Sequence, residues 1–478
     1  MARALVLFRN DLRVHDHPAL YHAMKENDEV IGIYILDKTT FNKTQYGFKK
    51  IGPFRAKFLV EGLNDLSKSL KHLNIPFFVY FDDILPKLKT FINDYNIKKL
   101  YYHRLIGEEE EKLERALVKT FNHLTHRTYF ERTLLNPDHL PFHIKAIPDV
   151  FTSFKQAVEA NLKIDPTLED LTPQKPLNIK GEQTFNCFHD LGFTEHIEAK
   201  FKGGEEEGLK RLQYYLFESK RVASYKTTRN GLLFDDDSSK FSPYLSQGSL
   251  SPRKVYEALK TFENTHVKNE STYWLFFELL WRDYFIFIHM KYGNLLFKPG
   301  GIKELCCDWV EDEEKVQRVF KAKTGYPLID ASIKEMRQTG FMSNRGRQNV
   351  ASFFTKNLSL NWLIGAAMFE MMLIDYDVSS NYGNWAYIAG VGNDQQPFRF
   401  FNLEKQGETY DKDALYAKTY LPSLKKLPSH LIYKIHRLNQ LDLAPYNIIL
   451  GKDYPKRMID FNQSIEKRKK HFESLLKK

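Results

Sequence analysis

The chain has 478 residues, enough for about two or three domain-sized units, and only three cysteines, Cys187, Cys306 and Cys307, without a Cys-x-x-Cys spacing. That pattern argues against a disulfide framework and against a Cys/His zinc site, and it is typical of a reducing, intracellular compartment. The formal net charge of +10, from 70 Lys and Arg against 60 Asp and Glu, suits a polyanionic partner, with a merely soluble basic protein as the alternative.

The first residues, MARALVLFRNDLRVHD, carry charges too early and too often for the apolar run of a signal peptide. The longest apolar stretches, such as residues 273–281, are too short to span a bilayer. We therefore expect a cytoplasmic protein without a membrane partner. We also expect a monomer.

Short apolar runs alternate with amphipathic segments over residues 1–130. The expected strands are residues 4–8, 30–36, 77–81, 100–103 and 127–130, and the expected helices are residues 55–73 and 108–121. This alternation predicts an α/β domain with a doubly wound parallel sheet. No G-x-G-x-x-G motif follows the first strand, so we do not expect a dinucleotide in the usual Rossmann position.

Regular periodicity is lost over residues 131–204, where six prolines interrupt the chain. Such a segment is typical of an interdomain connector that packs over the surface of a domain. Residues 205–478 return to a helical pattern and carry all five tryptophans, so they predict an all-α domain.

The segment YWLFFELLWRDYF places four notable side chains on one stripe of a helix, namely Trp274, Glu278, Trp281 and Arg282. The ordinary interpretation is a surface ion pair between Glu278 and Arg282, flanked by core tryptophans. The alternative is a pocket wall that offers a carboxylate beside an aromatic plate, which suits an unstacked base.

The segment FMSNRGRQN, if it opens a helix, places Asn344, Arg347 and Gln348 on one face. A buried Arg347 would need an anionic partner, for which Asp375 and Asp377 are candidates. The two aspartates are two positions apart and cannot share a helix face, so a bend is expected there. An exposed basic helix start remains the alternative for the first segment.

Residues 235–252, DDDSSKFSPYLSQGSLSP, gather hydroxyl groups beside Lys240. Serines at a loop-to-helix junction, together with free backbone N–H groups, can form a phosphate cradle. The same serines are also ordinary helix N-caps, so both interpretations stay open.

Several long blocks occur in one order along the chain: LVLFRNDLRVHDHPAL, SSKFSPYLSQGSLSP, ELLWRDYF, KTGYPLIDASIKEMRQTGFMSNRGRQNVASF and DYDVSSNYGNWAYIAGVGNDQQPFRFFN. Over nearly the whole chain these blocks resemble the photolyase/cryptochrome flavoprotein family and, within it, the cryptochrome DASH branch. The resemblance implies an α/β antenna-binding domain at residues 1–130, a connector at 131–204, and an all-α FAD-binding and DNA-binding domain at 205–478.

By this resemblance, the FAD phosphates and ribityl chain are held by Tyr225, Ser238, Ser239, Lys240 and Ser242. The isoalloxazine and adenine side is lined by Arg282, Asn344, Arg347, Asp375, Asp377 and Asn381. Arg347 is expected to pair with Asp375, and Asn381 matches the position that faces the flavin N5, where photolyases carry asparagine. The electron relay is expected to run through Trp385, Trp362 and Trp309, with Trp309 nearest solvent.

The resemblance also assigns the substrate side. Glu278 and Trp281 match the residues that contact and stack on the lesion, while Gln348 and Tyr387 replace more apolar residues of ordinary pyrimidine-dimer photolyases. A more polar pocket gives a flipped dimer less apolar contact, so single-stranded or looped DNA is the expected substrate. Asn344 and Gln348 stand where (6-4) photolyases carry histidines, so (6-4) repair is not expected. Phosphate contacts are expected from Arg229, Arg345 and Arg399.

The N-terminal domain is expected to hold an antenna, 5,10-methenyltetrahydrofolate, with Glu114 as its carboxylate ligand and residues 45–50 along its cleft. The implied activity is that of a deoxyribodipyrimidine photolyase, a carbon–carbon lyase in which reduced FAD splits cyclobutane pyrimidine dimers under blue or near-UV light, with catalytic roles for Glu278, Trp281 and Asn381. The alternative is a cryptochrome-type photoreceptor or regulatory flavoprotein without physiological repair, for which RNA or undamaged DNA are further candidate partners.

Overall fold

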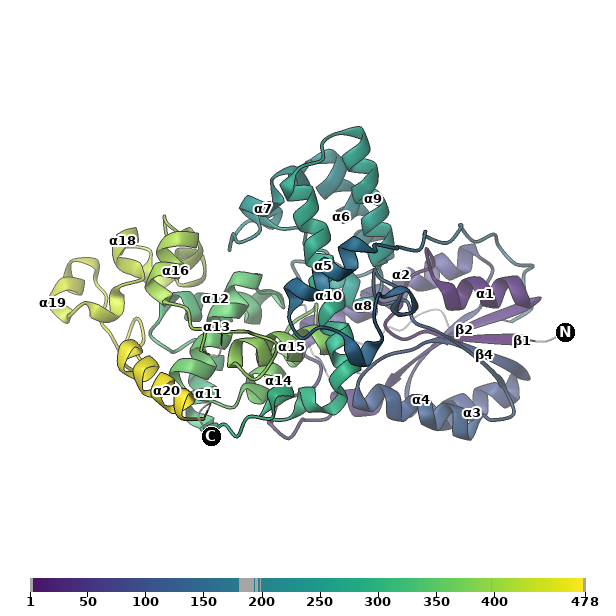
Figure 1. Ribbon diagram of the computed structural model, residues 1–478, viewed down its shortest axis with the longest axis horizontal. Helices are drawn as coiled ribbons and strands as arrows, with labels where there is room; N and C mark the ends of the chain where they lie inside the picture. Colours follow the sequence, from purple (N-terminus) through teal and green to yellow (C-terminus); the bar gives the residue numbers. More distant parts are fainter. Residues whose placement is uncertain (1–2, 180–192, 194–196, 198, 397, 476–478) are drawn as a thin grey trace. The chain divides into compact units, whose positions relative to one another are not determined.

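The computed structural model describes residues 3–179, 193, 197, 199–396 and 398–475 (Figure 1). The chain divides into two compact units. The first comprises Met1–Lys226, Ser239–Gly293 and Ile374–Ser379, and the second comprises Thr227–Ser238, Asn294–Leu373 and Ser380–Lys478. The expected domain boundaries at residues 130 and 204 stay a prediction.

The first unit is built on a five-stranded parallel sheet with the order β3-β2-β1-β4-β5. Its strands are β1 (Arg3–Leu7), β2 (Glu29–Asp37), β3 (Phe77–Asp82), β4 (Ile97–His103) and β5 (Thr125–Tyr129). β1 is central, and its Leu5 lies beside Ile31 of β2 and Leu100 of β4. The predicted parallel sheet is therefore confirmed, and each of its five strands overlaps an apolar run of the sequence.

Helices cover both faces of this sheet (Figure 1). They are α1 (Pro18–Glu26), α2 (Pro53–His72), α3 (Ile84–Asp94) and α4 (Glu108–Thr120). Successive residues of a strand point to opposite faces, so Val6 packs in the core with α1 and α2, and Leu5 in the core with α3 and α4. The strand order reverses between β1 and β4, which makes the sheet doubly wound, as predicted.

The rest of the first unit is helical. It contains α5 (Phe151–Ala160), α6 (Glu205–Gln213), the start of α7 (Tyr225–Thr228), α8 (Ser242–Gln247), α9 (Pro252–Thr265) and α10 (Glu270–Tyr292). The Asn269 side chain caps α10 by accepting from the amides of Ser271 and Thr272, and the helix ends at Gly293, whose φ of 55° is left-handed. Helix α5 lies inside the segment expected to be a connector, where the short apolar pattern gave no clear helical period.

The second unit is helical throughout its regular structure. Its helices are α11 (Glu313–Phe320), α12 (Pro327–Thr339), α13 (Asn344–Ser352), α14 (Trp362–Met372), α15 (Val378–Ala389), α16 (Leu403–Tyr410), α17 (Leu415–Tyr420), α18 (Ser429–Ile432), α19 (Gln440–Leu443) and α20 (Phe461–Leu475). The predicted helical C-terminal half is confirmed. Among the described residues, no helix is both long enough and apolar enough to cross a membrane.

Candidate cofactor and substrate site

Helix α10 carries the predicted substrate plate. Glu278 and Trp281 are both half-buried on it, three residues apart. The indole of Trp281 stacks on the ring of Phe151 from α5, with ring centroids 3.7 Å apart and an angle of 12° between the planes. One face of Trp281 is therefore occupied by protein, and a base can stack only on the other face.

Arg282 does not form the surface ion pair that the sequence left open. Its guanidinium donates to the backbone carbonyl oxygens of Arg132 and, at 3.2 Å, of Leu245. Burial lowers the pKa of Arg282. The residue ties α10 to the loop at Arg132 and to helix α8, so the ordinary interpretation of this stripe is wrong for Arg282.

The neighbouring Asp283 anchors the same helix. Its carboxylate is fully buried and accepts from the amides of Leu134, at 3.2 Å, and Leu135, at 2.8 Å. Burial raises the pKa of Asp283 to about 7, against the opposing influence of Arg282 and the two amides. Helix α10 is thus fixed to residues 134–135 through a carboxyl group that titrates near neutrality.

Asp375 and Asp377 lie in the turn just before α15, so the predicted bend is confirmed. The hydroxyl of Ser242 donates to Asp375 Oδ2 at 2.7 Å, which joins two of the predicted FAD residues. Asp377 pairs with the buried Arg132, a residue that the sequence analysis missed. Burial lowers the pKa of Arg132 to about 9.

The predicted phosphate cradle contains a backbone conformation that is unusual for its residue type. Lys240 is buried and has a left-handed φ of 57°. The carbonyl oxygen of Ser239 before it accepts from Arg211 Nε at 2.9 Å. Non-glycine residues in this conformation are strained, and such strain often occurs where a ligand is clamped. Tyr225 is buried, and Ser238 belongs to the second unit.

Helix α13 carries four of the predicted site residues in the second unit, Asn344, Arg345, Arg347 and Gln348. Ser343 caps it by accepting from the Gly346 amide at 3.1 Å. Arg345 donates to Gln348 Oε1 at 3.0 Å and to Asn230 Oδ1 at 2.9 Å, so it is held by protein partners. Burial and the neighbouring Arg229 lower the pKa of Arg345, so two of the three predicted phosphate-contacting arginines lie near each other.

Arg347 and Asn344 complete the helix start. Arg347 Nε donates to the carbonyl oxygen of Met342 at 2.8 Å, and its guanidinium lies 5.3 Å from the Phe341 ring centroid. Asn344 is exposed. Since Arg347 belongs to the second unit and Asp375 to the first, their pairing stays a prediction.

Arg399, also predicted to contact phosphate, forms a two-pronged pair with the buried Asp394, at 2.7 and 3.2 Å. Its guanidinium carbon lies 5.8 Å from the Tyr387 ring centroid, so two predicted substrate residues are neighbours. Asp394 was missed by the sequence analysis, although it lies only five positions away. The pair orients the guanidinium and partly neutralises its positive charge.

The three predicted relay tryptophans all lie in the second unit. The indole N–H groups of Trp309 and Trp362 both donate to the carbonyl oxygen of Pro299, at 2.9 and 3.0 Å. Trp362 and Trp385 are fully buried, and Trp309 is half-buried, as expected for the member nearest solvent. The structure thus joins two of the three through one shared acceptor, Pro299, which the sequence analysis missed.

Trp385 packs closely against α14. A Cβ atom at Gly365 would lie 2.2 Å from its ring, and the ring of Phe369 is 5.0 Å away between centroids. Asn381, one turn earlier on α15, donates from Nδ2 to the carbonyl oxygen of Ala366 at 3.0 Å. The two helices therefore hold Trp385 and Asn381 in fixed positions.

Glu114, the predicted antenna ligand, lies near the switch point between β1 and β4. Its carboxylate contacts Arg9 at 2.5 Å and accepts from the Leu105 amide at 2.8 Å. Ligands of doubly wound sheets bind at such switch points, beyond the carboxyl ends of the strands. Any ligand of Glu114 would have to share the carboxylate with these two donors.

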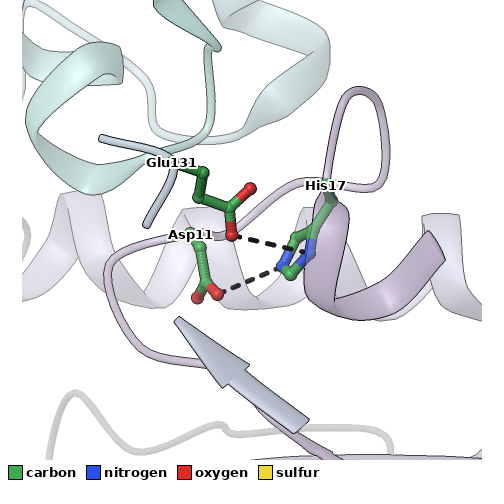
Figure 2. A group of neighbouring side chains, drawn as sticks. All are labelled: Asp11, His17 and Glu131. Atoms are coloured by element: carbon green, nitrogen blue, oxygen red, sulfur yellow. Dashed lines mark ion pairs between the residues drawn. The ribbon is translucent and has the colours of Figure 1, made fainter. Parts of the chain in front are cut away.

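A second buried ionic cluster lies at the same end of the sheet and was missed from sequence (Figure 2). His17 Nε2 lies 3.1 Å from Asp11 Oδ2, and His17 Nδ1 lies 3.8 Å from Glu131 Oε1. One atom from each residue falls within 4.8 Å of the others, a spacing that could hold a metal ion. However, Nδ1 accepts from the Leu20 amide at 3.1 Å, so the proton of a neutral ring stands on Nε2, facing Asp11. We therefore interpret the cluster as a buried network of a histidine and two carboxylates, in which Glu131 also pairs with Arg13 at 2.9 Å.

Known proteins similar to this chain agree with the geometry. Residues 274–474 match the FAD binding domain of DNA photolyase, and residues 4–176 match DNA photolyase. Cryptochrome DASH of Gloeobacter violaceus is 44% identical over 470 residues, covering 96% of this chain and 93% of its own. The chain belongs to the photolyase/cryptochrome family.

Further members support the assignment to the cryptochrome DASH branch. Cryptochrome DASH of Synechocystis sp. is 43% identical, covering 98% of this chain and 97% of its own. The crystal structure of a Synechocystis sp. cryptochrome superposes with a TM-score of 0.92 at 42% identity, covering 98% and 99% of the two chains. A bacterial class III photolyase from Agrobacterium tumefaciens superposes with a TM-score of 0.89 at 26% identity, covering 100% and 98%.

Two side chains predicted to lie near the FAD suit the cofactor. The indole Nε1 of Trp385 is buried and has no hydrogen-bond partner among the described residues, and Lys240 is a buried, strained cation. A buried N–H donor and a buried ammonium group both favour an acceptor-rich, anionic ligand. The residues present therefore fit FAD.

Proposed function

We propose that this cryptochrome DASH relative is a deoxyribodipyrimidine photolyase that splits cyclobutane pyrimidine dimers, preferentially in single-stranded or looped DNA. The observation that carries the proposal is the pair Glu278 and Trp281, a half-buried carboxylate and a clamped aromatic plate on one helix. FAD, when bound, supplies the light-driven one-electron chemistry. The protein acts in the cytoplasm as a monomer.

Trp281 reads the lesion by stacking. Its rear face is fixed by Phe151, so the ring is already oriented and loses little side-chain freedom when a base binds. Glu278, three residues earlier, holds the edge of the pyrimidine by a hydrogen bond. A single strand presents its bases unpaired and avoids most of the cost of flipping a dimer, about a few kcal/mol.

The residues proposed to hold the cofactor are Tyr225, Ser238, Ser239, Lys240, Ser242, Arg282, Asn344, Arg347, Asp375, Asp377 and Asn381. Ser242 fixes Asp375 through their hydrogen bond, and Ala366 fixes the amide of Asn381, which is the residue proposed to face the flavin N5. Trp385, Trp362 and Trp309 form the electron relay, supported by the acceptor that Trp362 and Trp309 share.

DNA phosphates are contacted by Arg229, Arg345 and Arg399, with Gln348 and Tyr387 beside them at the substrate. The net charge of +10 makes the affinity salt-dependent. We further propose 5,10-methenyltetrahydrofolate as the antenna, at the switch point where Glu114 lies.

A second candidate function is light sensing or regulatory nucleic-acid binding without repair, on RNA or undamaged DNA. It is favoured by Arg345 and Arg399, which already have protein partners and so offer weaker phosphate contacts than free arginines would. Fold and cofactor do not decide between the two functions.

Irradiation of the reduced protein with a single-stranded oligonucleotide that contains one dimer separates them. Repair restores the absorbance of the pyrimidine rings, in proportion to light dose and not in the dark. If the reduced, FAD-loaded protein binds the oligonucleotide but restores no absorbance, the repair proposal fails and the regulatory function is the remaining candidate. The Glu278→Gln variant serves as the matched control, because it keeps the shape of the carboxylate and removes its charge.

A further inference from the structure

Trp309 has a positively charged neighbour on its ring. The guanidinium carbon of Arg468, from α20, lies 4.6 Å from the centroid of the indole. Arg468 is only 5% exposed. Its Nε and one of its terminal nitrogens have no hydrogen-bond partner among the described residues, and the other terminal nitrogen reaches the Asp308 carbonyl oxygen at 3.4 Å. The indole face is therefore the main contact of this buried cation.

The nearby charges do not neutralise Arg468. The carboxylate of Asp308 lies 3.6 Å from His471 and acts on Arg468 only through its charge at longer range, while the Asp308 carbonyl oxygen accepts from Arg468. The ammonium group of Lys356 is 1% exposed and donates to the carbonyl oxygen of Ala389 at 2.7 Å. Burial, together with the charge of Arg468, lowers the pKa of Lys356 to about 7. Cys307, the remaining titratable neighbour, has a pKa that burial raises, so it stays a neutral thiol.

A cation over a neutral indole is attracted to the negative face of the ring. When the indole loses an electron it becomes a cation, and the same contact turns into a repulsion between like charges in a partly buried site. The repulsion disappears if the oxidised ring also loses its Nε1 proton. Arg468 therefore destabilises the radical cation of Trp309 but not its neutral radical.

We propose that Arg468 is a positioning residue that couples oxidation of Trp309 to loss of its indole proton. The inference rests on the proposed relay. In the step, Trp309 gives one electron to oxidised Trp362, whose own oxidation originates at the light-excited flavin. Trp309 then releases its Nε1 proton to solvent water and remains as a neutral radical, so charge and protons balance.

The surroundings of Nε1 fit this step. The Pro299 carbonyl oxygen that accepts from Nε1 is a very weak base, and it also accepts from Trp362, so it cannot keep the proton. Trp309 is half-buried and so has a side open to water. Once the proton is lost, the electron can return only together with a proton. Arg468 thereby slows the return of the electron along the relay.

The test compares the parent with Arg468→Met, which keeps the packing volume but removes the charge, and Arg468→Lys, which keeps the charge. Arg457→Gln, an arginine of the same unit paired with Asp460 at 3.2 Å, is the matched control. Flash excitation with transient absorption separates the tryptophan radical cation from the neutral radical. Conversion of cation to neutral radical should slow about tenfold in Arg468→Met, and it should stay within about twofold of the parent in Arg468→Lys and Arg457→Gln.

A second measurement needs neither flavin nor light. Azide radicals generated by pulse radiolysis oxidise accessible indoles, and the signal lost in Trp309→Phe isolates Trp309. The same slower proton loss is expected in Arg468→Met. Equal conversion rates in Arg468→Met and the parent, by either method, would overturn the inference and show that Arg468 only packs α20. If Trp309→Phe photoreduces its flavin like the parent, the proposed relay fails, whereas the pulse-radiolysis result for Arg468 still stands on its own.

Discussion

At the scale of single residues, the strongest feature is that the proposed functional side chains are held by protein before any ligand arrives. Phe151 supports Trp281, Ser242 donates to Asp375, and Asp394 pairs with Arg399. Such support fixes rotamers in advance and reduces the entropy lost on binding.

Trp281→Ala tests the aromatic plate. It should weaken binding of a dimer-containing single strand by tenfold or more, since stacking on an aromatic ring contributes roughly 1–3 kcal/mol per base. FAD occupancy and binding of an undamaged strand should change little. Titration of both strands measures the difference. An equal loss for the two strands would mean that the indole does not read the lesion.

Removing the rear support gives a finer version of the same test. Phe151→Leu keeps Trp281 but removes the ring that stacks on it. Part of the preference for the dimer-containing strand over the undamaged strand should therefore be lost. Phe154→Leu is the control, because Phe154 lies on the same helix and packs on Phe151, Tyr284 and Phe287 but has no ring contact to Trp281.

Asp375 can be tested together with Ser242. Asp375→Ala should lower FAD occupancy and reduce the free energy of unfolding by a few kcal/mol, on the order of what a buried pair loses when one partner is removed. Ser242→Ala removes one hydrogen bond and should cost about 1 kcal/mol. The double variant should cost less than the sum of the two, because each removes the same contact. Full occupancy and unchanged unfolding in Asp375→Ala would contradict the assignment.

At the scale of elements, the local patterns predicted the sheet, helices α2 and α4 and the helical character of the second half, but few of the long-range contacts. The runs at 30–36 and 77–81 became β2 and β3, because apolar runs between amphipathic segments have few other ways to be buried. The two aspartates at the bend were predicted from spacing alone.

The sequence did not predict the partner of Asp377. Arg132 lies 245 residues from Asp377, and no local pattern selects it among 70 lysines and arginines. Pro299 and Phe151 were missed for the same reason: a backbone carbonyl oxygen and an ordinary core ring have no sequence signature. The family resemblance proposed Ser242 and Asp375 as site residues, and the structure added the bond between them.

Helix α10 gives a prediction about pH. Asp283 has a pKa of about 7 in the folded state, above its ordinary value of 3.8, so between about pH 4 and 7 the folded state binds more protons than the unfolded state. Its contribution to stability is therefore present at low pH and is lost as the pH rises through this window, by up to about 1.4 kcal/mol per pH unit. Asp283→Asn cannot ionise, so its stability relative to the parent should rise from pH 4 to 7. Chemical unfolding at several pH values measures this difference. Parallel plots of the free energy of unfolding against pH for the two proteins would refute the prediction.

At the scale of the whole molecule, the excess of 70 basic over 60 acidic side chains bears on nucleic-acid binding. Arg345→Ala should weaken damaged and undamaged single strands alike. It should also lower the slope of log affinity against log salt by up to about 0.7, the value for one lost phosphate contact on a single strand. Arg345 also donates hydrogen bonds to Gln348 and Asn230. The loss of affinity should therefore exceed the loss expected from one missing phosphate contact.

Arg437→Ala is the control for that experiment, because Arg437 is an exposed arginine paired with Glu404 and lies outside the proposed site. Titrations at two salt concentrations suffice. If Arg437→Ala lowers the slope as much as Arg345→Ala does, binding is a diffuse property of the basic surface and Arg345 has no special part in it.

The close approach of Trp385 to Gly365 also limits how this chain can evolve. Glycine inside a helix costs about 0.5–1 kcal/mol relative to alanine, yet any side chain at position 365 would have to displace the tryptophan ring, 2.2 Å from where its Cβ would stand. In a library that contains all twenty amino acids at this site, selection for a folded, yellow protein should return glycine alone. Variants with a smaller residue in place of Trp385 should then accept alanine at 365, so position 365 can change only once position 385 has changed.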